Sequence, residues 1–195
     1  MRERFIRLSV FLLCLTPFSI LLWQAVFGGL GPDPAKTLML QTGEWSLRLL
    51  AITLLVSPLR QWTGQAWIMR LRRMLGLYAF FYACVHLLAF GHFYLGWSGA
   101  ILLEELAERP YITVGFAAWV LLLPLAFTST RGWQRRLRRN WQRLHRLIYP
   151  AAVLACLHLM WQARSDLGEA LFYIGVVALL LAWRVRRGWP QVTKV

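Results

Sequence analysis

The stretch MLGLYAFFYACVHLLAFGHFYLGW, residues 74–97, is apolar along nearly its whole length. About 20 such residues are needed for a helix to cross the roughly 30 Å hydrocarbon core of a bilayer. The whole chain shares this character, because 58% of its 195 residues are hydrophobic and only 15% are charged. Such a balance is too apolar for an ordinary soluble domain. The stretch therefore predicts a transmembrane helix, and the chain a membrane protein.

Five further apolar runs, separated by short charged segments, resemble this one. Together they predict an all-α membrane protein, a single domain over 1–195 built as a six-transmembrane helical bundle, with spans at about 8–27, 45–59, 74–97, 111–127, 147–161 and 170–185. The first run follows basic residues, as the core of a signal peptide does. It is longer than such a core, however, and no small-x-small cleavage site follows it. We therefore expect it to be a span.

The charged residues predict the orientation. With the N-terminus in the cytoplasm, every acidic residue except Glu3 falls on the outer side, and of the 22 Lys and Arg residues all but Lys36, Arg48, Arg109 and Arg164 fall on the inner side. The positive-inside rule then predicts cytoplasmic N- and C-termini in a multi-pass protein of the bacterial cell inner membrane. Topology and contact with anionic membrane lipid explain the net charge of +14, so no nucleic-acid partner is expected.

The chain leaves no room for a soluble redox domain. The longest segment between expected spans covers only residues 128–146, and the sequence contains neither G-x-G-x-x-G nor G-x-x-x-x-G-K. A built-in nicotinamide or flavin domain of the Rossmann type is therefore excluded. Any soluble electron donor or acceptor must be another protein.

Three of the four histidines fall within expected spans, and two of them, His86 and His158, lie well away from the span ends, where ionisable side chains are rare and usually functional. His86 and His158 are each preceded by a basic inner end at a similar distance, roughly 20 Å along a helix, so they should lie at the same depth in the outer half of the bilayer. Their surroundings, CVHLL and CLHLM, are also alike. Two facing imidazoles suit the iron of a b-type haem, so we predict that His86 and His158 ligate one haem. Interhelical hydrogen bonding is the alternative for each residue.

The sequence allows two interpretations of the histidine in the inner half of the bundle. His145 lies about 20 Å below His158, where a second haem would sit in a transmembrane electron pathway. No histidine is expected opposite it, and at that depth the third span offers Arg72 and Arg73, which we therefore name with His145 as candidate cofactor-binding residues. A lipid-interface role for His145 is the alternative. His92, near the outer rim, is expected to be interfacial.

The segments RRMLGLY (residues 72–78), leading to His86, and WQRLHRLIY (residues 141–149), leading to His158, resemble those of the ferric-reductase-like transmembrane haem proteins. The resemblance covers nearly the whole chain and includes the length, the six spans and the placement of the histidines. Larger relatives carry two histidines on each of two helices, whereas the third span here lacks the inner one. This difference puts a second bis-histidine haem in doubt.

The resemblance is to the branch of the family that serves a periplasmic methionine sulfoxide reductase. It implies that electrons from the quinone pool pass through haem b, with FMN also bound, to a periplasmic molybdopterin-containing reductase that repairs oxidised periplasmic proteins. The chain would then be the electron-transfer subunit of an oxidoreductase system and not its catalytic subunit.

Two other functions are kept open. A haem-containing ferric reductase would use the same haem and a different electron acceptor. A non-haem transporter or assembly protein would use His86 and His158 to relay protons or to brace helices. Haem absorbance separates the second alternative from the others.

An acidic segment is expected on the outer side. The loop 98–110 carries Glu104, Glu105 and Glu108, and charged rims guide the encounter of redox partners. We therefore predict this loop as the docking surface for a periplasmic partner. The alternative is that these acids lie on the outer side only because of the charge asymmetry that sets the membrane topology.

Overall fold

The computed structural model describes residues 2–163 and 167–186, and every regular element in these residues is helical. The long helices are α1 (Arg2–Phe27), α2 (Pro34–Thr63), α3 (Met69–Phe93), α5 (Pro110–Phe127), α8 (Ile148–Gln162) and α9 (Leu167–Arg186). Shorter helices connect them, namely α4 (Gly99–Glu108), α6 (Arg131–Leu137) and α7 (Arg139–Leu144), with the 3₁₀ turns Ala66–Ile68 and His145–Leu147. The expected all-α class is confirmed.

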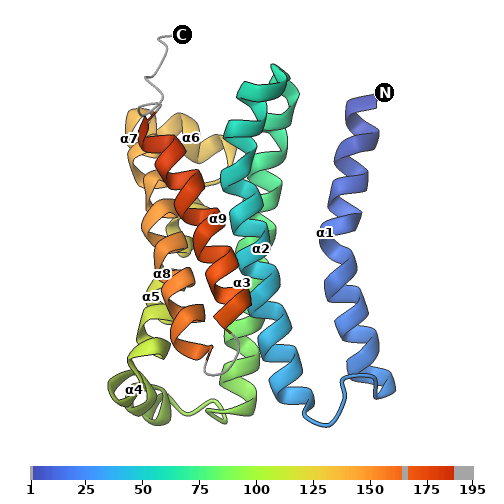
Figure 1. Cartoon of the computed structure of the whole chain (residues 1–195), viewed down its shortest axis with the longest axis vertical. Helices are drawn as coiled ribbons and strands as arrows, with labels where there is room; N and C mark the ends of the chain where they lie inside the picture. The colour runs from blue at the N-terminus through green and yellow to red at the C-terminus, as the bar shows by residue number, and fades with distance from the viewer. Residues whose placement is uncertain (1, 164–166, 187–195) are drawn as a thin grey trace.

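The long helices lie side by side and alternate in direction (Figure 1). Helices α1, α3 and α8 run one way and α2, α5 and α9 run the other, so the start of α1 and the end of α9 lie at the same end of the bundle. Helices α6 and α7 cover that end, and α4 lies at the opposite end. Within the bundle, α2 packs chiefly on α3, and α5 packs chiefly on α8.

Local sequence signals set the helix ends. Asp33 caps α2 by accepting a hydrogen bond from the backbone N–H of Lys36 at 3.0 Å, and Pro34 opens the first turn, where its missing N–H costs nothing. Gly64 ends α2 with a φ of 68°, the left-handed conformation that glycine adopts without strain. Ser98 caps α4 in the same way as Asp33, so the expected acidic loop is in fact a short helix.

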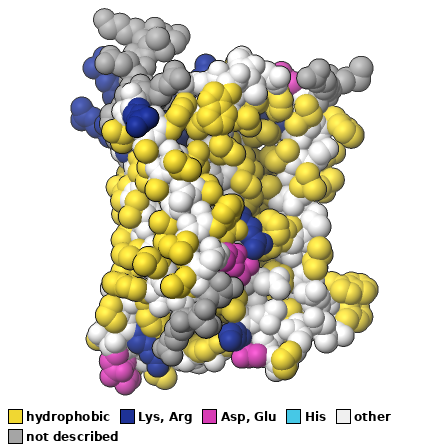
Figure 2. All heavy atoms as spheres, viewed as in Figure 1, with side chains coloured by type: hydrophobic (Ala, Val, Ile, Leu, Met, Phe, Trp, Pro, Cys, Tyr) yellow, Lys and Arg dark blue, Asp and Glu magenta, His cyan; other side chains and the backbone are white. Residues whose placement is uncertain are grey.

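Five helical segments are long and apolar enough to cross a membrane: Glu3–Phe27, Ala66–Phe93, Pro110–Phe127, Arg139–Gln162 and Leu167–Arg186. The chain is therefore a multi-pass membrane protein. Hydrophobic side chains cover most of the flank in view (Figure 2), as lipid-facing helices require. The expected count of six spans is not matched on this criterion, because α2, which contains the run 45–59, is not among the five. Its charged residues Glu44, Arg48 and Arg60 lower its hydropathy.

The third expected span also ends earlier than predicted. Helix α3 stops at Phe93, and Trp97 lies in the following turn with a φ of 64°. The backbone N–H of Trp97 donates to the carbonyl of Gly91 at 3.0 Å. Hydropathy could not locate this end because the turn residues are as apolar as those of the helix.

Helix α1 is joined to the bundle by the fully buried side chain of Tyr82 from α3. Its hydroxyl accepts from the backbone N–H of Phe18 at 2.9 Å and donates to the carbonyl of Cys14 at 2.8 Å. The side chain thus inserts into the backbone ladder of α1 next to Pro17, where the helix is already weakened by the missing N–H. Both backbone groups remain satisfied in surroundings without water.

Candidate functional site

His86 of α3 and His158 of α8 lie next to each other inside the bundle. The centroids of their rings are 6.2 Å apart, with an angle of 79° between the ring planes. Both side chains are half-buried, and they come from helices that run in the same direction (Figure 1). Two histidines far apart in the sequence are therefore brought to the same depth.

A backbone carbonyl orients each ring. Nδ1 of His86 lies 2.8 Å from the carbonyl oxygen of Met39 in α2, and Nδ1 of His158 lies 2.7 Å from that of Tyr111 in α5. A carbonyl oxygen can only accept, so Nδ1 carries the hydrogen and donates in both cases. The lone pair of each neutral imidazole is then on Nε2. This is the arrangement in which a second hydrogen bond orients a metal-binding histidine.

A glycine faces each histidine at close range. A Cβ at Gly43 would lie 3.0 Å from Nδ1 of His86, and one at Gly115 would lie 2.7 Å from Nδ1 of His158. Both distances are shorter than an ordinary Cβ contact, so the absence of a side chain is what lets the ring approach the neighbouring helix. The glycines thereby allow the two Nδ1 hydrogen bonds.

The two halves of this site repeat each other. The carbonyl residue and the histidine are 47 residues apart in both halves, and each glycine follows its carbonyl residue by one helical turn. Sequence reasoning missed Met39, Gly43, Tyr111 and Gly115. The shared spacing from glycine to histidine was the signal that could have found them.

The paired rings suit a single metal ion between them. Two bonds of about 2 Å, the usual length between an imidazole nitrogen and a metal, take up about 4 Å of the 6.2 Å separation, and the radii of the two rings take up the rest. Among the described residues there is no group of three or more His, Cys, Asp or Glu side chains that could hold a metal ion. His86 and His158 would therefore suit the iron of a haem, whose porphyrin would supply the remaining ligands.

His145 has a different environment, at the start of the 3₁₀ turn that precedes α8. Its Nε2 lies 3.1 Å from the hydroxyl of Thr128, and its ring stacks on Trp141 with centroids 4.0 Å apart. The Thr128 hydroxyl donates its only hydrogen to the carbonyl of Pro124, so Nε2 of His145 must be the donor to Thr128. A metal could bind at Nε2 only if this hydrogen bond broke.

The remaining residues singled out in the sequence, Arg72, Arg73 and His92, have surroundings that do not include His86 or His158. Arg73 is exposed, whereas Arg72 is half-buried and lines a hollow between helices that also contains Arg184. His92 is exposed, and its Nδ1 accepts from the indole N–H of Trp97 at 3.3 Å.

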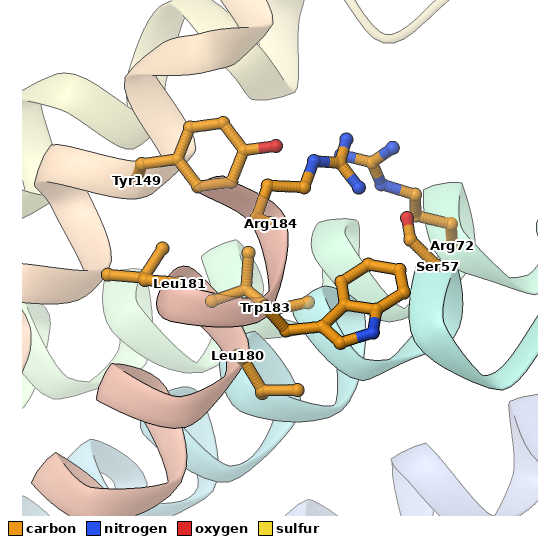
Figure 3. A pocket seen from close by; sticks show the side chains of 8 residues that line it. Ser57, Arg72, Tyr149, Leu180, Leu181, Trp183 and Arg184 are labelled. Atoms are coloured by element: carbon orange, nitrogen blue, oxygen red, sulfur yellow. The ribbon is translucent and has the colours of Figure 1, made fainter. Parts of the chain in front are cut away.

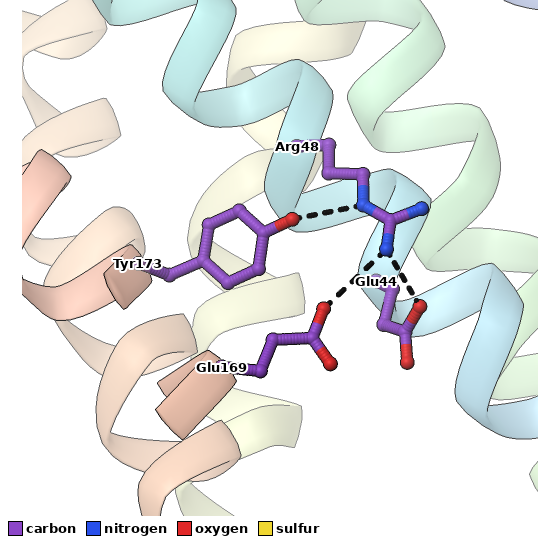
Figure 4. Close-up of polar contacts among 4 residues, drawn as sticks. All are labelled: Glu44, Arg48, Glu169 and Tyr173. Carbon is purple, nitrogen blue, oxygen red and sulfur yellow. Dashed lines mark hydrogen bonds and ion pairs between the residues drawn. The ribbon is translucent and has the colours of Figure 1, made fainter. Parts of the chain in front are cut away.

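A charged network between α2 and α9 includes Glu44, the residue that follows Gly43 in the sequence (Figure 4). Arg48 binds Glu44 at 2.9 Å and Glu169 at 3.4 Å, and its Nε donates to the hydroxyl of Tyr173 at 2.8 Å. Both acids of this network belong to helices, because Glu44 lies within α2 and Glu169 in the first turn of α9. The network connects α9 to the helix that orients His86.

The three glutamates of the expected docking loop differ in their exposure and in their pairing. Glu104 and Glu108 are exposed on α4, one helical turn apart. Glu105 is half-buried, and it pairs with Arg109 at 3.0 Å. Only the first two present their charge fully to the surroundings.

Comparison with known proteins agrees with these features. Residues 42–156 match the family described as "Ferric reductase like transmembrane component". The "Protein-methionine-sulfoxide reductase heme-binding subunit MsrQ" of Xanthomonas axonopodis pv. citri (strain 306) is 56% identical over 171 residues, which cover 88% of this chain and 77% of that protein.

Proteins of the same description from two other bacteria are also similar. The one from Xanthomonas euvesicatoria pv. vesicatoria (strain 85-10) is 54% identical, over 92% of this chain and 84% of that protein. The one from Bordetella pertussis (strain Tohama I / ATCC BAA-589 / NCTC 13251) is 44% identical, over 93% and 89%. No solved structure matches the chain. On this evidence the chain belongs to the MsrQ family of subunits, within the ferric reductase like transmembrane components.

Proposed function

We propose that this chain is a membrane b-type cytochrome that carries electrons to the catalytic subunit of a methionine sulfoxide reductase system. The observation that supports this most is the pair His86 and His158, with ring centroids 6.2 Å apart and both Nδ1 atoms held by backbone carbonyls. The names of the relatives indicate the cofactor, haem, and the system, methionine sulfoxide reduction.

His86 and His158 would hold the haem, which supplies an iron that accepts and releases one electron at a time. The Nδ1 hydrogen bonds hold both rings in one orientation and make Nε2 the ligating atom. Gly43 and Gly115 keep the rings close to α2 and α5, so that both ligands are fixed before the cofactor binds. The apolar helices around the site exclude water and thereby help to set the reduction potential.

The proposed topology has six crossings with both termini in the cytoplasm. Helix α1 finishes at one end of the bundle, and α3 begins at the opposite end (Figure 1). Helix α2, which joins α1 to α3, therefore runs the full length of the bundle (Figure 1). A helix of 30 residues is about 45 Å long, enough to cross the bilayer, and the pairing of Arg48 with Glu44 and Glu169 reduces the cost of its charges. Reporter fusions test the orientation, because periplasmic activity of a fusion at Thr130 would contradict it.

The proposed acceptor is the periplasmic molybdopterin-containing reductase MsrP. His86 and His158 lie in the C-terminal parts of α3 (Met69–Phe93) and α8 (Ile148–Gln162). Both helices run toward the end of the bundle that carries α4, which is periplasmic in this topology (Figure 1). Exposed Glu104 and Glu108 would guide the partner to that end. The quinone pool as electron donor, and FMN as a further cofactor, remain predictions from the family resemblance.

Optical spectra of the purified protein test the proposal. His86→Ala and His158→Ala should each remove the same low-spin haem, because either change leaves the iron with one protein ligand. His92→Ala is the matched control and should keep the wild-type spectrum. A colourless wild-type protein from cells with ample haem would reject the cytochrome in favour of a transporter or assembly protein. Rapid oxidation of the reduced haem by ferric ions, but not by MsrP, would instead favour a ferric reductase.

A further inference from the structure

A second polar site lies at the end of the bundle where α1 begins, between α2, α3, α8 and α9 (Figures 1 and 3). It is a small, partly open hollow of about 10 Å³, room for one oxygen of a bound group, and its polar lining comes from Ser57, Arg72, Tyr149 and Arg184. Leucine side chains and Trp183 form the rest of its wall. This site is separate from the histidine pair and has no part in the proposed ligation of haem.

Two guanidinium groups meet in this hollow. Arg72 comes from the first turn of α3 and Arg184 from the last turn of α9, and their charged ends lie side by side (Figure 3). Within residues 2–163 and 167–186, neither side chain forms an ion pair with a carboxylate. Nε of Arg184 is buried and has no hydrogen-bond acceptor in these residues.

An anion would stabilise such an arrangement. Two like charges repel, and a buried N–H without an acceptor costs free energy. Tyr149 borders the two groups without neutralising them, and its ring lies 5.7 Å from the Cζ atom of Arg184 (Figure 3). A negatively charged oxygen group placed between the guanidiniums would satisfy both.

The position of the hollow indicates which anion it is. Helices α3, α8 and α9 belong to segments that are long and apolar enough to cross a membrane, and this end of the bundle is the cytoplasmic one in the proposed topology. The polar lining is therefore at the depth of the inner-leaflet headgroups, and the leucines extend toward the acyl chains. Arginine binds phosphate oxygens with two parallel hydrogen bonds, and basic hollows between helices on this side hold anionic headgroups.

We propose that Arg72 and Arg184 bind the phosphodiester of an anionic phospholipid of the inner leaflet, with Tyr149 and Ser57 completing the contact. The bound lipid would fasten the end of α9 to the start of α3. Lipid binding would thus hold the last helix of the bundle in place.

Native mass spectrometry of the protein in a neutral detergent tests this site. The probes are phosphatidylglycerol and phosphatidylcholine with identical acyl chains, and inorganic phosphate alone. Wild-type protein should retain phosphatidylglycerol in preference to phosphatidylcholine. Arg72→Gln and Arg184→Gln should each weaken this binding by about tenfold or more, the loss expected for a charge-assisted hydrogen-bond pair. Arg186→Gln, which changes an exposed arginine of the same turn, should have no effect.

Three results would overturn the proposal. Equal retention of phosphatidylglycerol by wild type and by both glutamine variants would reject the site. Saturation by inorganic phosphate with no preference for the lipid would identify a site for free phosphate. Loss of haem absorbance with unchanged lipid binding would assign the arginines to the haem. Arg184→Lys keeps the charge and should retain most of the binding, which separates a specific effect from misfolding.

Discussion

Gly115→Ala is the sharpest test of how the histidine site is built. The new Cβ would lie 2.7 Å from Nδ1 and 2.8 Å from Cε1 of His158, whereas ordinary Cβ contacts begin at 3.4 Å. The ring must therefore move by about 0.7 Å, because the close-packed helices leave little room for the backbone to give. The same change at Gly43 starts from 3.0 Å and requires a shift of only about 0.4 Å.

The cost follows from what holds the ring. Overpacking typically costs about 1–3 kcal/mol, and loss of the 2.7 Å hydrogen bond to Tyr111 adds about 1 kcal/mol. The better helix propensity of alanine returns about 1 kcal/mol. We expect a net loss of about 1–3 kcal/mol in stability. Haem affinity should fall about 10–100-fold, as it does when the orienting partner of a metal ligand is lost.

Haem titration followed by absorbance, together with thermal unfolding in detergent, measures both effects. Gly43→Ala should show the same changes at smaller size. Gly175→Ala in α9 is the matched control, because no atom lies within 4 Å of the added Cβ, and it should keep wild-type haem affinity. Wild-type haem affinity in Gly115→Ala would refute the idea that this glycine sets the position of the ligand.

Four further predictions concern other parts of the bundle. Tyr82→Phe removes the hydroxyl that bridges two backbone groups of α1, so thermal unfolding should show a loss of about 1–3 kcal/mol with haem content unchanged. Arg48→Gln leaves two carboxylates without their shared cation and should destabilise the protein by about 1–3 kcal/mol in the same assay; a neutral result would mean that the network is not structural. His145→Ala should leave the low-spin haem spectrum intact, and loss of that spectrum would contradict the separate roles of the inner and outer histidines. Replacing Glu104 and Glu108 together by glutamine should slow oxidation of reduced haem by the periplasmic reductase, most strongly at low ionic strength, with equal rates at low salt as the contrary result.

The membrane class and the choice of His86 and His158 were within reach of the sequence. Apolar runs long enough to cross a bilayer are a local property, and a histidine inside such a run is costly enough to attract attention by itself. Counting residues from the basic inner ends was sufficient to expect both rings at one depth, because the rise of a helix per residue is constant. Helix α2 was the span least evident from hydropathy, because its charged residues can lie within a membrane only when they pair with residues of another helix.

The contacts that orient the site depended on the tertiary structure. Met39 and Tyr111, whose carbonyls accept from His86 and His158, are each 47 residues away from their histidine in the sequence and lie on other helices. Hydropathy gives the length and depth of each helix but not its rotation about its own axis, and that rotation decides which carbonyl or glycine faces a ring. For the same reason the meeting of Arg72 with Arg184 could not be foreseen from two basic residues at the ends of separate spans. Side-chain pairing between helices is set by packing, which the one-dimensional pattern does not encode.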